Sequence, residues 1–317
     1  MPAVHDPENQ CANAVLMVRP ARFGSNPETA ESNRFQHAEL IADDAALAVR
    51  EFDGLVRRLT DAGVEVIVAQ DPPEPAKPDA CFPNNWVSFH ADGTVVLYPM
   101  LAPSRRAERR PEHLAAVERT GFRIARTIDL SPLEGHGEFL EGTGSLVLDR
   151  RSRLAYACLS PRTTPAALTE FCAALGYRAV EFDALGPDGR PIYHTNVLMA
   201  VGEGFAVVCG AAIPDAPCRA AVFGELAAAG HEVIDIDVEE MNHFAGNMLA
   251  LRARDGGARI AMSETAWQSL APAKRRRLER HGGIVAASIP TIEWEGGGSV
   301  RCMIAEVFLP RGESGPR

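Results

Sequence analysis

The stretch Asn84-Asn85-Trp86-Val87-Ser88-Phe89-His90-Ala91-Asp92-Gly93-Thr94-Val95-Val96-Leu97-Tyr98 contains the pattern that decides the fold. Two asparagines precede a short apolar strand, Asp92-Gly93 supplies a turn, and a second apolar strand returns from Thr94 to Tyr98. An Asp-Gly pair between two apolar segments is typical of a β-hairpin. We therefore interpret the stretch as a hairpin whose first strand is opened by polar side chains.

The same pattern recurs along the chain at intervals of about 50 to 60 residues. Each copy starts with polar residues, continues as an apolar strand, turns, and returns as a second apolar strand. The further copies cover residues 141–158, 194–209 and 242–262. A half-copy starts at Arg301-Cys302, and the apolar stretch from Ala14 to Val18 can complete it. Five such units would close into a ring, with each first strand near the central axis.

The repeats predict a single α/β domain over residues 1–317, built as a five-bladed propeller around a central site. Apolar spacing predicts a helix from Asn33 to Leu59 and a further strand from Val64 to Ala69. The stretch Phe23-Gly24-Ser25-Asn26 is expected to form a loop.

Composition excludes several classes of partner. A hydrophobic share of 46% with 23% charged residues is ordinary for a globular protein, and a net charge of -10 argues against nucleic acid or anionic membrane. The seven cysteines have no framework spacing, the N-terminal stretch is polar, and no apolar run reaches the length of a membrane span. We therefore expect a cytoplasmic protein that acts on a small molecule. The oligomeric state stays open, with a homodimer among the assemblies considered.

Polar openers from all five repeats would meet at the axis of such a ring. They are Asn85, Glu141, His194 with Asn196, Asn247, and Cys302. Any one of them alone is most simply a strand cap or a satisfied polar residue. A thiol, an imidazole, a carboxylate and several amides at matching repeat positions instead predict an active site.

Cys302 is the expected nucleophile of this site. It follows Gly296-Gly297-Gly298, where glycine allows positive φ and a close approach of the backbone to a ligand. A cysteine beside a histidine forms a nucleophile and acid/base pair, so we expect His194 to move the protons. Glu141 would orient His194 or hold an N–H of the substrate. The cysteines and histidines lack zinc spacing, and this chemistry requires no metal and no organic cofactor.

The asparagines indicate the charge of the substrate. A site that selects a guanidinium cation usually offers carboxylates. A ureido group is neutral and carries both N–H donors and a C=O acceptor, which an amide side chain can match. Asn85 and Asn196 therefore favour a ureido substrate, or a reaction that passes through one.

Together these motifs resemble the guanidine-modifying superfamily of arginine deiminases, dimethylarginine hydrolases, amidinotransferases and arginine or succinylarginine dihydrolases. The resemblance covers nearly the whole chain and implies the pentein fold, a five-bladed α/β propeller. Cys302 in GGGSVRCM, His194 in YHTN and Glu141 in LEGTGS are similar to the catalytic residues of that family. The motifs PDACFPNN, PMLAPSRRAE and SPRT imply binding roles for further residues, namely Asp79, Asn84, Asn85, Arg105 and Arg162. The two arginines would pair with the α-carboxylate of the substrate.

Two departures from the deiminases imply a particular branch. Asn85 and Asn196 stand where deiminases carry guanidinium-binding aspartates. The N-terminal stretch from Met17 to Ala30, with Phe35-Gln36, is similar to citrulline-utilising hydrolases, in which Asn26 would be another amide near the reacting carbon. The resemblance thus implies a citrulline ureidase, which converts citrulline and water to ornithine, CO2 and ammonia through a covalent cysteine intermediate.

Other functions stay open on the sequence alone. The same residue set is compatible with an arginine dihydrolase, an arginine deiminase or a dimethylarginine dimethylaminohydrolase. A different class of protein, a propeller that only binds a small amino acid and has lost its activity, is a further alternative.

Overall fold

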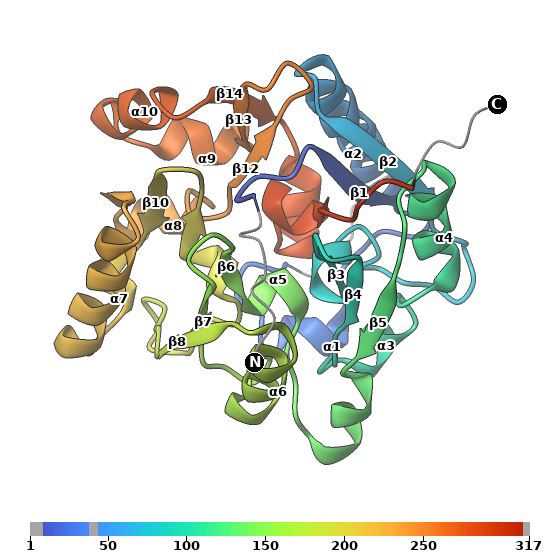
Figure 1. Cartoon of the computed structure of the whole chain (residues 1–317), viewed down its shortest axis with the longest axis horizontal. Coiled ribbons are helices and arrows are strands. Elements are labelled where there is room, and N and C mark those ends of the chain that lie inside the picture. Colours follow the sequence, from blue (N-terminus) through green and yellow to red (C-terminus); the bar gives the residue numbers. More distant parts are fainter. Residues whose placement is uncertain (1–8, 38–43, 313–317) are drawn as a thin grey trace.

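Each repeat of the sequence folds into one small sheet, and five three-stranded sheets surround a common axis (Figure 1). The structure is a computed structural model that describes residues 9–37 and 44–312. The predicted five-bladed α/β propeller is confirmed. Among the described residues, no helix combines the length and apolar character that crossing a bilayer requires.

All five blades have the same topology. In the first full blade, β3 (Val87–Phe89) pairs antiparallel with β4 (Thr94–Leu97), which pairs in parallel with β5 (Arg126–Asp129). The other blades, each given from its first strand to its third, are β6 (Val147–Asp149), β7 (Leu154–Cys158) and β8 (Arg178–Phe182); β9 (Met199–Val201), β10 (Phe205–Val208) and β11 (Glu232–Asp235); β12 (Leu249–Arg252), β13 (Ala258–Ser263) and β14 (Gly283–Ala287); and β15 (Ala305–Val307), β1 (Ala14–Arg19) and β2 (Glu65–Gln70).

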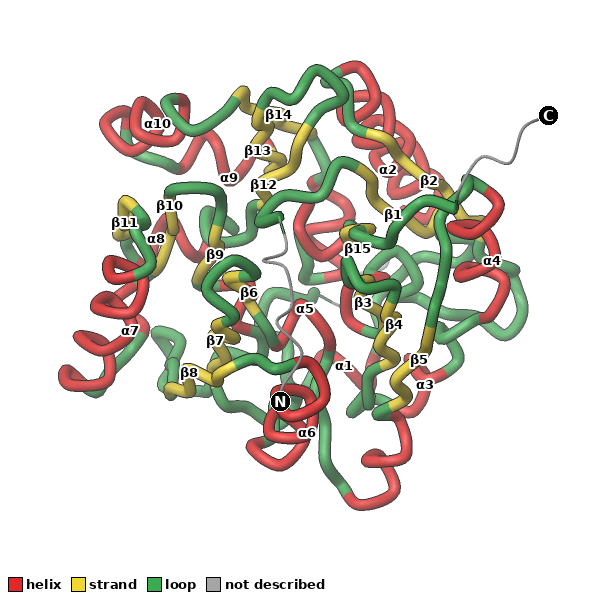
Figure 2. The backbone as a smooth tube through the Cα atoms, viewed as in Figure 1, coloured by secondary structure: helices red, strands yellow, loops and turns green. Residues whose placement is uncertain are grey.

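Helices connect the second strand of each blade to its third, because a parallel pair needs a crossover. They lie on the outside of the ring (Figure 2). The main crossover helices are α2 (Asp44–Asp61), α4 (Pro111–Arg119), α6 (Pro165–Leu175), α7 (Ala216–Ala228), α9 (Glu264–Ser269) and α10 (Pro272–Glu279). The remaining short helices are α1 (Pro27–Ala30), α3 (Pro103–Arg106), η2 (Ser131–His136), η4 (Gly210–Ala212), α8 (Val238–Asn242) and η5 (Ile292–Gly296).

The two ends of the chain close the ring, as the sequence predicted. Strand β15 pairs antiparallel with β1, with Leu16 opposite Ala305, and β1 pairs in parallel with β2, with Val15 opposite Val66. Leu16 and Val15 are fully buried. The last blade is therefore assembled from segments at opposite ends of the sequence.

The third strands of four blades were missed by the sequence analysis. These outer strands, β5, β8, β11 and β14, are four or five residues long and expose part of their side chains. By contrast, the first two strands of the blade at β6 and β7 are buried throughout. A short, half-exposed strand has no continuous apolar run, so its signal in the sequence is weak.

The predicted helix from Asn33 to Leu59 is wrong at its start. Residues 33–37 are irregular, residues 38–43 lie outside the described part, and α2 begins at Asp44. The Asn33 side chain accepts a hydrogen bond from the Phe35 N–H at 3.1 Å and donates to the Gly297 carbonyl at 3.2 Å. Such side-chain to backbone bonds compete with helix formation.

Short turns at the axis precede the first strands of the blades. Four of them are helical: η1 (Pro83–Asn85), α5 (Gly142–Ser145), η3 (Thr195–Val197) and η6 (Val300–Met303). Hydrogen bonds join neighbouring turns, for example from Thr195 Oγ1 to the Ser145 carbonyl at 2.5 Å. The approach is so close that a Cβ on Gly142 would lie 2.2 Å from the carbonyl oxygen of Asn84. The polar openers therefore lie in these turns, rather than in the strands themselves.

Gln10 provides a test of how the blades are joined. Its buried side chain donates to the Leu148 carbonyl at 2.9 Å and the Val201 carbonyl at 3.2 Å, and accepts from the Arg150 N–H at 2.8 Å. We expect Gln10→Ala to lower the free energy of unfolding by about 1 to 3 kcal/mol in urea denaturation, because buried backbone groups lose their partners. Thr60→Ala, which removes one exposed bond, should stay within about 0.5 kcal/mol of the parent. Equal stabilities of the two variants would contradict this expectation.

Candidate active site

The turns at the axis surround a small cavity. Its volume is ≈ 20 Å³, which is room for about one water molecule. Side chains and backbone from segments far apart in the sequence line it: Thr29, Asn33, Asp79, Phe82, Asn85, Arg105, Arg162, Tyr193, His194, Gly296, Gly297, Gly298 and Cys302. The prediction that these segments meet at one place is therefore fulfilled by the fold, and Cys302 and His194 share one cavity.

The thiol of Cys302 lies among amide donors. Cys302 belongs to η6 and is almost completely buried. Asn247 Nδ2 lies 3.3 Å from its Sγ and Asn196 Nδ2 lies 3.6 Å from it. Asn247 is fixed, because its Oδ1 accepts from the Arg301 N–H at 3.0 Å and its Nδ2 also donates to the Asn196 carbonyl at 3.0 Å. Both amide nitrogens are therefore within hydrogen-bonding distance of the sulfur.

Asn247 was recognised in the sequence as a polar opener, but it was not placed among the substrate-binding or catalytic residues. Its position in the repeat, which matches that of the other polar openers, was the feature of the sequence that could have placed it in the site. The structure puts it closer to the sulfur than Asn196, which was included.

His194 is oriented by Glu141. The imidazole Nε2 lies 2.9 Å from Glu141 Oε2, and both residues are buried. Burial lowers the pKa of His194 to about 4, although its hydrogen bond to Glu141 opposes this shift. The imidazole is therefore neutral near pH 7, the form that can accept a proton.

Glu141 is a fully buried carboxylate surrounded by cations and donors. Arg162 Nη1 lies 3.4 Å away and Arg105 Nη1 lies 3.9 Å away, while the Leu101 N–H donates to Oε1 at 3.1 Å. Burial alone would raise the pKa of Glu141. The charges of Arg162 and Arg105 and the hydrogen bond from His194 outweigh this effect and lower it to about 2. Glu141 is thus ionised throughout the physiological range.

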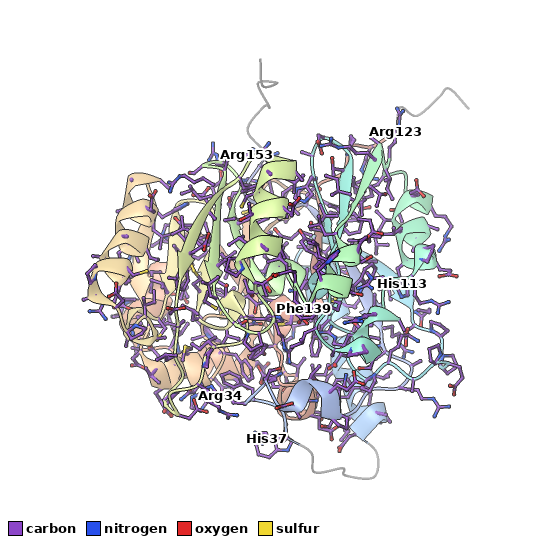
Figure 3. The ribbon with its side chains drawn as sticks, turned by 90° about the horizontal axis from the view of Figure 1, so that it is seen from below. Arg34, His37, His113, Arg123, Phe139 and Arg153 are labelled. Carbon is purple, nitrogen blue, oxygen red and sulfur yellow. The ribbon has the colours of Figure 1, made fainter. Side chains whose placement is uncertain are left out.

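The segment containing α1 covers the cavity and is tied to the residues below it. Asn26 Nδ2 donates to Asp79 Oδ2 at 2.7 Å, and Asn26 Oδ1 accepts from the Glu28 N–H, which caps α1. In Figure 3 the labelled Arg34 and His37 lie at one end of the molecule, and Arg153, at a hairpin turn, lies at the other. Asn26 therefore contacts a residue of the cavity wall but does not itself line the cavity.

The two arginines predicted to bind a carboxylate already have partners in the protein. Arg105 makes two bonds of 2.9 Å to the carboxylate of Glu108 and donates from Nη1 to Asn85 Oδ1 at 2.8 Å. Arg162 donates to Ser32 Oγ from Nε at 2.9 Å and from Nη2 at 2.7 Å, in addition to its contact with Glu141. Both line the cavity, and each already makes four hydrogen bonds within the protein.

The adjacent asparagines Asn84 and Asn85 differ in position. Asn85 lines the cavity and its Nδ2 has no hydrogen-bond partner within the described residues. The side chain of Asn84 is buried away from the cavity, and the backbone carbonyl of this residue accepts from Thr143 Oγ1 at 3.4 Å. The structure thus brings Asn85 to the cavity and leaves Asn84 outside it.

Several wall residues carried no signal in the sequence analysis. Tyr193 donates its hydroxyl to the Gly297 carbonyl at 2.8 Å and lines the cavity beside Phe82 and Thr29. Gly297 has a φ of +60°, and a Cβ there would lie 2.5 Å from Asn33 Nδ2, so the glycine loop packs directly against the covering segment. Within residues 9–37 and 44–312, no group of three or more His, Cys, Asp or Glu side chains could hold a metal ion.

The neutral state of His194 predicts a dependence of stability on pH. In the unfolded chain this imidazole protonates near pH 6.5, but in the folded protein only near pH 4. Between these values the unfolded state binds more protons, so stability falls as the pH falls. We expect this group to contribute a loss of roughly 3 kcal/mol across that window in urea unfolding.

A variant isolates this contribution. His194→Gln should lose less stability between pH 6.5 and 4 than the parent, since glutamine does not titrate. His113 is also buried, and burial lowers its pKa to about 4, so His113→Gln serves as the matched control. It should remove only the part of the pH-dependent loss of stability that His113 contributes. Identical pH slopes for the parent and His194→Gln would show that the imidazole is not held neutral.

A comparison with protein families identifies the chain over most of its length. The family model described as eukaryotic N,N dimethylarginine dimethylhydrolase matches residues 19–309. A search of curated proteins found no match. The family match does not select the citrulline branch, which therefore stays a prediction.

Solved structures share the fold at low sequence identity. The substrate-bound N-terminal domain of ArgZ, an arginine dihydrolase from cyanobacteria, is 17% identical with a TM-score of 0.71, over 93% of this chain and 99% of that one. A complex of AgrE with L-arginine is 18% identical with a TM-score of 0.73, over 95% of this chain and 41% of that one. A dimethylarginine dimethylaminohydrolase adduct with S-methyl-L-thiocitrulline is 15% identical with a TM-score of 0.63, over 93% and 99% of the two chains.

The family match over nearly the whole chain, together with the five-bladed fold, excludes the alternative of a propeller that only binds an amino acid. The chain belongs to the N,N dimethylarginine dimethylhydrolase family of the pentein superfamily, and it is a hydrolase that acts on carbon–nitrogen bonds other than peptide bonds.

Proposed function

We propose that the protein hydrolyses the ureido group of citrulline and releases ornithine, carbon dioxide and ammonia through an intermediate on Cys302. The observation that carries this proposal is the orientation of the Asn85 amide at the cavity wall. It supports a neutral head group that carries a hydrogen-bond acceptor.

Arg105 determines how Asn85 is oriented. A guanidinium has only donors, so the bond of 2.8 Å from Arg105 Nη1 requires the oxygen of Asn85 to face it. The Asn85 Nδ2 group therefore points away from Arg105, where it is buried without a partner among the described residues. It lies near His194, since a Cβ on Gly144 would be 2.5 Å from this nitrogen and 2.7 Å from His194 Nδ1. An unpaired buried N–H is costly, and a ligand acceptor would remove that cost.

This donor distinguishes the candidate substrates. The C=O of a ureido group can accept a hydrogen bond from Asn85, whereas a guanidinium, which carries only donors, cannot. The orientation therefore supports citrulline more directly than arginine or a methylated arginine.

In the proposed first step, His194 accepts the proton of the Cys302 thiol as the sulfur attacks the ureido carbon. Asn247 and Asn196 stabilise negative charge on the sulfur. The bond from that carbon to the terminal NH2 then breaks, and His194 supplies the proton with which ammonia leaves. The product of this step is a thiocarbamate in which the ornithine side-chain nitrogen remains attached to the carbonyl carbon.

In the proposed second step, water attacks the same carbon while His194 takes its proton. The carbon–sulfur bond breaks and the thiol is regained. The released carbamate of ornithine decomposes to ornithine and carbon dioxide. The balance is citrulline plus water to ornithine, carbon dioxide and ammonia.

Arginine is a second candidate substrate, because the carboxylate of Asp79 also lines the cavity. One round of hydrolysis would convert arginine to citrulline and ammonia. A second round at the same site would give ornithine and a second ammonia.

Product analysis tests the proposal. We expect citrulline to give ornithine and ammonia in equal amounts, and Cys302→Ala to lower kcat by about a thousandfold or more because the nucleophile is lost. The products from citrulline, arginine and N,N-dimethylarginine should be measured separately by mass spectrometry. Citrulline as the final product from arginine, or dimethylamine as the main product from dimethylarginine, would overturn the proposal.

Asn85→Asp should reverse the selection of the head group. A carboxylate oxygen in place of the Nδ2 group would repel the ureido C=O, so kcat/KM for citrulline should fall by at least about a hundredfold. Binding of arginine should tighten, because the new oxygen accepts from its N–H groups. Asn85→Ala is the control: it removes the donor without adding an acceptor, and should weaken citrulline without favouring arginine. If Asn85→Asp and Asn85→Ala behave alike, the orientation of the amide does not set the preference.

A further inference from the structure

We infer that Glu108 is a positioning residue that sets the preference for a ureido over a guanidino head group, by fixing Arg105 and, through it, the amide of Asn85. This inference rests on the proposed function. Glu108 does not line the cavity and takes no part in the proposed reaction. Its burial therefore needs another explanation.

Glu108 is a buried carboxylate whose side chain faces Arg105. It lies just after α3 and is 2% exposed. Oε1 accepts from Arg105 Nε at 2.9 Å and Oε2 accepts from Nη2 at 2.9 Å, the two-pronged geometry that holds a guanidinium in one plane. Burying a carboxylate is expensive unless a cation compensates it. The ion pair between Glu108 and Arg105 therefore determines both the position and the orientation of the Arg105 guanidinium.

Because Glu108 holds two nitrogens of the Arg105 guanidinium, the third nitrogen is left for the cavity side. With Nε and Nη2 bound to Glu108, Nη1 donates to Asn85 Oδ1 at 2.8 Å. Two other carboxylates lie within reach of the same guanidinium, Asp79 at 3.6 Å and Glu141 at 3.9 Å. Burial opposes the charge on Arg105, but Glu108, Asp79 and Glu141 outweigh it and raise the pKa of this group, so it is always a cation.

Loss of the Glu108 charge would change where Arg105 is held. The guanidinium would be drawn toward Asp79 and Glu141, the carboxylates that remain. Asn85 would then lose the donor that holds its oxygen, and its amide could turn to present Oδ1 to the cavity. An exposed amide oxygen accepts from a guanidinium and repels a ureido C=O, so the preference would move from citrulline toward arginine.

Binding measurements in a Cys302→Ala background test the inference, because they separate recognition from chemistry. Dissociation constants for citrulline and for arginine would be measured by isothermal titration calorimetry. We expect Glu108→Gln to move the ratio of these constants toward arginine by at least about tenfold. The stoichiometry measured by calorimetry gives the fraction of the protein that can bind ligand. Partial unfolding therefore lowers the stoichiometry and leaves the ratio of the two dissociation constants unchanged.

Glu134→Gln is the matched control. Glu134 also pairs with arginines of the same segment, at 2.6 Å from Arg109 and 3.1 Å from Arg106. Among the described residues, its side-chain hydrogen bonds and ion pairs are to Arg106, Arg109 and the Met100 N–H, none of which lines the cavity. Its variant should change the ratio by no more than about twofold. If Glu108→Gln does not fold, Glu108→Asp retains the charge at a shorter reach, and should move the ratio in the same direction by a smaller factor.

A double variant tests whether Glu108 acts through Asn85. In an Asn85→Asp background the two side-chain oxygens are equivalent, so adding Glu108→Gln should produce no further change in the ratio. An equal weakening of both ligands by Glu108→Gln, with the ratio unchanged, would overturn the inference and leave Glu108 a purely structural residue. A parent that binds arginine more tightly than citrulline would defeat the proposed function instead. In that case a shift of the ratio toward arginine in Glu108→Gln would still support the positioning role.

Discussion

The buried carboxylate of Glu141 is the interaction on which the arrangement of the site depends. An isolated charge in a protein interior is prohibitively costly, so cationic partners must accompany it. Arg105 comes from the blade of β4, Arg162 from the blade of β7, and His194 from the turn before β9. Three neighbouring blades are thereby held to one point. The same carboxylate orients His194, whose imidazole is kept neutral by burial against the pull of that charge.

The rest of the site carries amide groups, which add no charge. Asn85 and Asn247 are each held by a partner that leaves little choice of orientation: Arg105 faces the oxygen of Asn85, and the Arg301 N–H faces the oxygen of Asn247. The Nδ2 donor is therefore the group that remains: among the described residues it is unpaired in Asn85, and it is directed at the Cys302 sulfur in Asn247. A scaffold that can bind a guanidinium with carboxylates could therefore bind a neutral head group once amides replace them and are fixed by backbone or guanidinium donors.

The cavity of the site is small in this structure. Asn26 is bonded to Asp79, Ser32 to Arg162, and Asn33 to the backbone of Gly297, so the segment around α1 is tied to three different parts of the wall. A cavity of ≈ 20 Å³ cannot hold an amino acid. Admission of a substrate requires these contacts to separate, and a substrate that restores them on closing would be shielded from bulk water.

The sequence alone determined the number of blades, their hairpins, the closure of the ring by both chain ends, and the convergence of Cys302, His194, Glu141 and Asn85. These follow from apolar runs and turn residues at a regular spacing, which are local properties. The outer strands were not predicted, because they are short and half-exposed. Only the tertiary structure decided which way the Asn85 amide faces, that Asn84 lies away from the cavity, and that Glu108 and Asn247 support the site. Those outcomes depend on which donors and acceptors meet across blades, and hydrogen-bond direction between distant segments is not encoded in local pattern.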